Sequence, residues 1–218
     1  MDGSFKELIF DDLDMKFRVP TGIFVGGSSQ SGKTTWILRL LKHYKTMFEP
    51  VPQSIVYAYG EKNEDLIRKL EKMNVKTHKG VPTDDYLDSN RKPLLLILDD
   101  LLEDINEKWL QSLFTRKSHH RNIAVVFVTQ ALFDKKLVKS RSNAHYVVLM
   151  RAPNSALSIR NFAMQMFADK FKDFLHAYEE ATKSQFGYVV VDSHPMSPPE
   201  LRVRTNIFPD DKENFVYY

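Results

Sequence analysis

The sequence contains no cysteine among its 218 residues, and this absence excludes several classes of protein. Without thiols there can be no disulfide framework, no cysteine nucleophile and no cysteine-ligated zinc. Such a chain suits a reducing compartment. Glycine and proline are also sparse, at 8 and 10 residues without a tripeptide period, so collagen-like and low-complexity chains are excluded as well.

Long hydrophobic runs are missing too. The run from Leu94 to Leu98 has five consecutive apolar residues, and none in the chain approaches the roughly 20 that cross a bilayer. The first residues show no basic region followed by an apolar stretch of signal-peptide length. We therefore expect neither secretion nor membrane insertion.

Charge of either sign is nearly balanced, with 31 Lys and Arg against 28 Asp and Glu. A surface for nucleic acid would thus have to come from local clusters of basic residues. Hydrophobic residues make up 43% of the chain, which can support an ordered core. At this length we expect one domain, over residues 20–218, preceded by an irregular lead-in over residues 1–19.

Short β-rich runs alternate with helical patterns along the chain. This alternation predicts an α/β fold with right-handed crossovers and a mainly parallel sheet. The closing runs 187–191 and 201–208 are close enough in sequence to form an antiparallel pair at the sheet edge. The other predicted strands are 22–25, 54–59, 93–99, 123–129 and 145–150, and the predicted helices are 34–48, 63–72, 104–114, 155–167 and 170–182.

A phosphate-binding motif lies between the first predicted strand and helix. Residues 27–34 fit G-x-x-x-x-G-K-[ST], in the strand–loop–helix context that the motif requires. Backbone N–H groups of such a loop surround phosphate, Lys33 would neutralise β- and γ-phosphate oxygens, and Thr34 would ligate Mg²⁺. The predicted ATP-binding residues are Gly27, Ser28, Ser29, Gln30, Ser31, Gly32, Lys33, Thr34 and Thr35.

Two aspartates follow the apolar run 94–98, at the strand end where ligands bind in open α/β sheets. This pattern is typical of a Walker B strand. Asp99 would hold Mg²⁺, and Asp100 would polarise the attacking water, with Glu103 as the alternative base. Helix N-capping would also account for the two aspartates, although not for the loop upstream.

A third polar residue follows the predicted strand 123–129. Gln130 would lie at the tip of a strand beside the phosphate-binding loop, where it could contact the γ-phosphate or its water. Other P-loop classes fit less well. The chain has no N-K-x-D and no D-x-x-G, which disfavours a Ras-type GTPase, and Arg151 and Arg160 are too far apart for the lid of a small-molecule kinase.

Four segments together resemble the poxvirus-type DNA-packaging ATPases of the FtsK/HerA superfamily, in the branch found in Polinton/Maverick elements and adintoviruses. They are residues 26–35, 94–100, 118–130 and 146–150, and the resemblance extends over roughly residues 18–208. It implies an ASCE-type, FtsK/HerA-like P-loop NTPase. Its expected fold is a three-layer sandwich with a mainly parallel sheet and antiparallel C-terminal strands.

The resemblance further implies an ATP-driven motor that moves double-stranded viral DNA into a preformed capsid. Such a motor would be a homo-oligomeric ring, a hexamer or pentamer, that contacts a capsid or portal vertex protein. Its place would be the host cell interior, in the nucleus or a cytoplasmic viral factory, or in association with the virion. In the superfamily an arginine acts in trans on the neighbouring γ-phosphate. Arg121 matches its position best, and Arg116 is the nearby substitute.

Two features depart from the family or leave alternatives open. Asp100 stands where many superfamily members have Glu, which leaves the identity of the base open, and His119 and His120 lack partners at metal-ligand spacing. The candidate DNA contacts could equally be a solvated charge run. The alternative functions are a non-translocating ATP-dependent DNA-binding switch of the transposition or partition type, and a small-molecule phosphotransferase. The candidate DNA contacts are Lys135, Lys136, Lys139 and Arg141.

Overall fold

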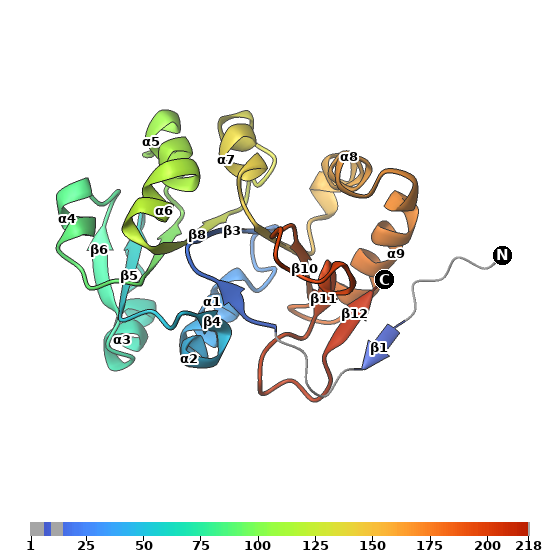
Figure 1. Cartoon of the computed structure of the whole chain (residues 1–218), viewed down its shortest axis with the longest axis horizontal. Helices are drawn as coiled ribbons and strands as arrows, with labels where there is room; N and C mark the ends of the chain where they lie inside the picture. Colours follow the sequence, from blue (N-terminus) through green and yellow to red (C-terminus); the bar gives the residue numbers. More distant parts are fainter. Residues whose placement is uncertain (1–6, 10–14, 218) are drawn as a thin grey trace.

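A ten-stranded sheet runs through the molecule in the computed structural model, which describes residues 7–9 and 15–217 (Figure 1). The strands lie in the order β1-β12-β11-β10-β9-β3-β8-β7-β5-β6. Neighbours from β9 to β6 are parallel, and those from β9 to β1 are antiparallel. The predicted α/β fold, with a mainly parallel sheet and antiparallel C-terminal strands, is therefore confirmed.

The strands of this sheet are mostly short. Two further strands, β2 (Phe17–Arg18) and β4 (Phe48–Glu49), form a separate parallel pair. The ten strands of the main sheet are β1 Glu7–Ile9, β3 Thr21–Gly26, β5 Ser54–Tyr59, β6 Lys76–Lys79, β7 Leu94–Asp99, β8 Ile123–Thr129, β9 Tyr146–Met150, β10 Tyr188–Asp192, β11 Val203–Thr205 and β12 Phe215–Tyr217.

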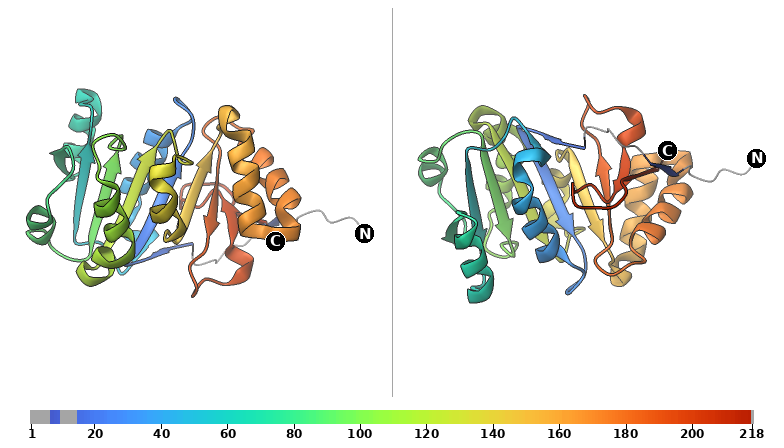
Figure 2. Two further views of the ribbon diagram at one scale, coloured as in Figure 1. Left: turned by 90° about the horizontal axis from the view of Figure 1, so that it is seen from above. Right: turned by 90° about the horizontal axis from the view of Figure 1, so that it is seen from below.

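Helices cover both faces of the sheet and make the two outer layers of the sandwich (Figure 2). Helices α1 to α3 lie over one face, and the helices from α5 to α9 lie over the other. Their bounds are α1 Lys33–Lys42, α2 Tyr44–Met47, α3 Glu64–Lys72, α4 Asp84–Asp88, α5 Glu107–Ser112, α6 Ser118–Arg121, α7 Val138–Ser142, α8 Ala156–Phe167 and α9 Phe171–Ala181.

Two apolar cores result, one on each face of the sheet. Strand β7 contributes to both, because alternate side chains of a strand point to opposite faces. Leu95 and Ile97 pack on the α1 side, whereas Leu94, Leu96 and Leu98 pack on the other side. All five are fully buried, as the run of consecutive apolar residues predicts. By the same alternation Asp99 lies on the α1 side, where the phosphate-binding loop begins its helix.

Two predicted helices differ from the observed ones. The helix expected over 34–48 breaks after Lys42, resumes as α2, and ends before the strand β4. Pro50 disfavours a helical conformation at the preceding residue, and Phe48 instead packs its ring on Phe17 at 5.5 Å. The helix expected from residue 104 begins at Glu107, because the Asn106 side chain caps it. It continues through a π-helical turn, Leu113–Lys117, into α6.

Several short elements were not predicted. Strand β6 is a sheet edge with polar residues only, so it lacks the apolar pattern that marks a strand. The lead-in expected to be irregular contributes β1, which pairs with β12, and β2, which pairs with β4. Residues 1–6 and 10–14 of that lead-in lie outside the described residues. Within the described part of the chain, no helix combines the length and apolar character needed to span a bilayer.

Candidate nucleotide-binding site

The predicted phosphate-binding loop joins β3 to α1 in the middle of the sheet, between the neighbouring strands β9 and β8. Gln30 and Gly32 adopt left-handed φ angles of 61° and 105°. Gly32 is the N-cap of α1 and has no side chain to cap it, whereas α3, α4 and α5 are each capped by a side chain. The first turn of α1 also lacks acidic residues. Its backbone N–H groups can therefore bind an anion.

Lys33 places a positive charge across this loop. Its Nζ donates hydrogen bonds to the carbonyl oxygens of Gly27 at 2.8 Å and Ser28 at 2.7 Å. Burial lowers the pKa of Lys33, while the nearby carboxylates of Asp99 and Asp100 raise it. The lysine is thus held at the loop, near the two carboxylates that follow the apolar run of β7.

Thr34 and Asp99 are brought to one cavity, although they are far apart in the sequence. The cavity measures about 140 Å³ and is also lined by Tyr57 and Asp100. Burial raises the pKa of Asp99, while a hydrogen bond from the Tyr57 hydroxyl and the charge of Lys33 lower it. Asp99 is therefore an acceptor that a nearby cation would keep ionised.

These two oxygen donors fit the requirements of Mg²⁺. Mg²⁺ is commonly held by one or two protein oxygens together with substrate phosphates and water. Thr34 would supply its hydroxyl and Asp99 its carboxylate. Among the residues that the structure describes, no group of three or more His, Cys, Asp or Glu side chains could hold a metal by itself. The described residues therefore fit a cation shared with phosphate rather than a metal site made of protein ligands alone.

A second cavity, of about 370 Å³, adjoins the first through Asp100 and Glu61. Gln130 lines it and follows Thr129, which pairs with Gly26 at the start of the loop. The predicted neighbours Asp100 and Gln130 thus share one cavity beside the loop. Glu103 lines it too, but its side chain is 86% exposed and forms an ion pair with Lys136 at 3.1 Å. Asp100 is also exposed, but it lines both cavities, whereas Glu103 lines only the second.

Glu61 was not predicted, yet it lines both cavities. It is brought there by Gly60, where a Cβ atom would lie 2.3 Å from the carbonyl oxygen of Asp100. Only glycine allows the loop after β5 to pass this close to the loop after β7. The available signal was an acidic residue just after a buried strand, but its use required knowing that β5 and β7 are neighbours.

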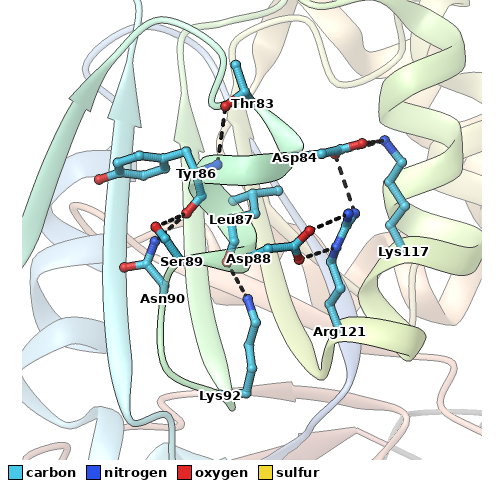
Figure 3. A network of polar contacts seen from close by, with 10 residues as sticks. All are labelled: Thr83, Asp84, Tyr86, Leu87, Asp88, Ser89, Asn90, Lys92, Lys117 and Arg121. Atoms are coloured by element: carbon cyan, nitrogen blue, oxygen red, sulfur yellow. Dashed lines mark hydrogen bonds and ion pairs between the residues drawn. The ribbon is translucent and has the colours of Figure 1, made fainter.

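The two candidate arginines lie away from this loop. Arg121 lies just before the amino end of β8, whereas the loop follows the carboxyl end of the parallel strand β3. The two are therefore at opposite ends of the strands within one chain. Its guanidinium donates two hydrogen bonds to Asp88, at 2.6 and 2.9 Å, and one to Asp84 at 3.4 Å (Figure 3). Lys117 also binds Asp84 and lowers its pKa. Arg116 is exposed on the π-helical turn.

The four candidate DNA-binding residues fall into two kinds. Lys135 and Lys139 are exposed, and Lys136 pairs with Glu103. Arg141 is partly buried, donates to the carbonyl oxygen of Leu132 at 2.6 Å and lies over the Phe133 ring. Lys135 and Lys139 are therefore the accessible basic residues of the four, while Arg141 holds the loop after β8.

The predicted histidine pair contributes no described metal site. The ring of His119 lies 6.1 Å from that of His145, close to the start of β9, and His120 is exposed. These positions do not bring either histidine to the phosphate-binding loop.

No protein-family model matches this sequence, and no curated protein matches it. Among solved structures, an ATPase of the type III secretion system of pathogenic bacteria is similar, with 13% identity and a TM-score of 0.40 over 64% of this chain and 53% of that chain. A KaiC-like protein from Pyrococcus horikoshii OT3 has 14% identity and a TM-score of 0.41 over 91% and 89%. Such low values say nothing of what this chain binds or does.

Proposed function

We propose that this protein is a P-loop ATPase that hydrolyses ATP with Mg²⁺. The observation that carries the proposal is the convergence of Thr34 and Asp99 on one cavity beside an uncapped helix N-terminus with the G-x-x-x-x-G-K-T loop. A glycine-rich turn with an exposed lysine would not require a buried carboxylate from another strand to face the same cavity.

Each residue has a definite role in the proposed reaction. The loop amides and Lys33 bind the phosphates, and Thr34 and Asp99 hold the cation, which when bound neutralises charge on the β- and γ-phosphate oxygens. Asp100 accepts a proton from water while the water oxygen attacks the γ-phosphorus. The bond to the β-phosphate oxygen breaks, giving ADP and phosphate. Gln130 contacts the γ-phosphate or the attacking water.

In its finer form the proposal is a motor that packages double-stranded viral DNA into a capsid. The resemblance of the four sequence segments to FtsK/HerA packaging ATPases supports it. The exposed Lys135 and Lys139 could follow phosphates without reading sequence, as a motor on arbitrary DNA requires. A homo-oligomeric ring would supply Arg121 or Arg116 to a neighbouring site, and a capsid or portal protein would complete the machine.

The first experiment measures steady-state ATP hydrolysis over a range of protein concentrations, with and without long double-stranded DNA. Lys33→Ala should abolish turnover, and Lys45→Ala, an exposed lysine on α2, is the matched control. Full activity in Lys33→Ala would overturn the site.

This assay, together with a roadblock-displacement assay and a DNA-retention assay, separates the finer alternatives. Cooperative stimulation by DNA, with displacement of a bound roadblock, supports the motor. Nucleotide-dependent retention on DNA without displacement indicates a switch, and turnover that ignores DNA and needs a small acceptor indicates a phosphotransferase.

A further inference from the structure

An exposed aromatic side chain lies against the first turn of α1. Phe186 belongs to the loop between α9 and β10 (Figure 1), and it is 45% exposed. A Cβ atom added to Gly32 would lie 2.7 Å from the Cβ of Phe186 and 2.8 Å from its Cδ1. The aromatic side chain therefore covers the glycine that begins the helix of the phosphate-binding loop.

The backbone holds Phe186 in this place in an uncommon conformation. Its φ is 61°, in the left-handed region that bulky residues rarely adopt. The next residue, Gly187, approaches the end of α9 so closely that a Cβ atom would lie 2.1 Å from the carbonyl oxygen of Ala181. Its N–H donates to the carbonyl of Ser184 at 3.1 Å. The loop is thus folded tightly while the side chain that it carries stays exposed.

The position of Phe186 in the sheet order indicates which end of a bound nucleotide would lie near it. Asp99 and Gln130 follow β7 and β8, on one side of β3 in the sheet, whereas Phe186 precedes β10, on the other side of β3. Because β10 is antiparallel to β9, its start lies at the same edge as the end of β3. A triphosphate with its γ-phosphate toward Asp99 and Gln130 would extend its nucleoside the opposite way across the loop, toward Phe186.

We propose that Phe186 is the stacking platform for the base of the bound nucleoside triphosphate. This inference rests on the proposed function and deepens it by adding the site for the base to that for the phosphates. Stacking on an aromatic ring tolerates any base because every base has a π face. The site therefore binds the base mainly by its aromatic face, and it discriminates weakly between adenine and guanine nucleotides.

The test compares two ligands that share the phosphates and differ in the base. Binding of ATP and of inorganic tripolyphosphate to Phe186→Ala, Phe186→Tyr and wild type is measured by calorimetry with Mg²⁺. We expect Phe186→Ala to weaken ATP about 5- to 100-fold and to leave tripolyphosphate unchanged. Phe186→Tyr should keep the wild-type affinity for ATP. Met196→Ala, another exposed apolar residue beyond the far end of β10, is the matched control.

Two results would overturn the proposal. Unchanged ATP affinity in Phe186→Ala means that the ring does not contact the base, and an equal loss for both ligands means that it only supports the loop. Wild type that binds neither ligand, or Lys33→Ala that binds both normally, refutes the proposed function itself.

Phe186→Trp keeps the test decisive where the alanine variant fails to fold. Wild type already contains Trp36 and Trp109, so its fluorescence is subtracted from that of the variant. The remaining signal, from the new tryptophan, should change when ATP binds and should not change when tripolyphosphate binds. An equal response to both ligands would again contradict the stacking role.

Discussion

The hydroxyl of Tyr57 donates a hydrogen bond to Asp99, the carboxylate at the end of the neighbouring strand. Both residues line the cavity beside Thr34. Burial, with the charge of Asp99, raises the pKa of Tyr57, so the tyrosine stays neutral and can donate. The same bond favours the ionised form of Asp99 against the burial that raises its pKa. Tyr57 therefore prepares this carboxylate to hold a cation.

We expect Tyr57→Phe to raise the pKa of Asp99 and to weaken the binding of Mg²⁺ at the site. Because Asp99 must be ionised, activity should fall as pH drops through its pKa, and the acid limb of the pH–rate profile should move to higher pH in the variant. The Mg²⁺ concentration for half-maximal rate should rise about tenfold, as the loss of one hydrogen bond to a charged group predicts. Tyr59→Phe, which changes a residue of the same cavity, is the control. An unmoved acid limb would contradict this role.

The ion pairs of Arg121 make a second prediction. Arg121 joins α6 to α4 through Asp88 and Asp84, so Arg121→Ala should lower the free energy of unfolding by about 1 kcal/mol, a value limited by the partial exposure of the pairs. Asp88→Asn should cost a similar amount but retain the guanidinium. If Arg121 acts in trans, only Arg121→Ala loses assembly-dependent hydrolysis.

Denaturant unfolding and ATPase assays of the assembled protein separate these effects. Arg116→Ala, at an exposed position, should leave stability within about 0.5 kcal/mol of wild type. Equal losses of hydrolysis in Arg121→Ala and Asp88→Asn would show that the ion pair supports the fold only. Loss in Arg116→Ala alone would move the trans role to that residue.

Strands buried on both faces could be predicted to within one residue at each end, because burial on both sides leaves a continuous apolar run. The runs 54–59 and 123–129 correspond to β5 and β8. The edge strand β6 could not be predicted, because it exists through its pairing with β5 and carries no apolar pattern. Helix ends were less certain where a cap or a following proline decided them.

The candidate site divides in the same way. The loop and Asp99 carry a local motif, so the sequence alone indicates them. Tyr57, Glu61 and Phe186 reach the site only through the order of strands in the sheet, which no local pattern encodes. Arg141 has the charge of a DNA contact, but its partners in the fold are a carbonyl oxygen and an aromatic ring.

A buried ion pair between the antiparallel strands makes a third prediction. Asp192 and Arg204 are each about 1% exposed, and Nη1 of Arg204 donates to Asp192 at 2.8 Å. Asp192→Asn should lower the free energy of unfolding by about 3 to 5 kcal/mol, because it leaves a buried charge without its partner. The double variant Asp192→Leu with Arg204→Met should lose much less. The free energies of unfolding are measured by denaturant unfolding. An equal loss in the single and the double variant would contradict this account.

The fourth prediction concerns acid stability and the histidines at the amino ends of the central strands. Nδ1 of His145 lies 2.9 Å from the Thr21 hydroxyl, and its ring lies 4.6 Å from that of His194. Burial, followed by the charges of His194 and His119, lowers the pKa of His145 to about 4, while Asp192 opposes the shift. In the unfolded chain a histidine has a pKa near 6.5. The unfolded state therefore binds the proton first as pH falls.

The sign of the effect follows from this difference. The stability that neutral His145 contributes is complete above pH 6.5 and is lost as pH falls from 6.5 towards 4. His145→Asn keeps a polar partner for Thr21 but does not titrate, so its unfolding free energy should fall less steeply over this range. Carboxylates titrate in both proteins, and the difference between the two curves isolates His145. His176→Asn, at an exposed position on α9, should run parallel to wild type, and a parallel curve for His145→Asn would contradict the prediction.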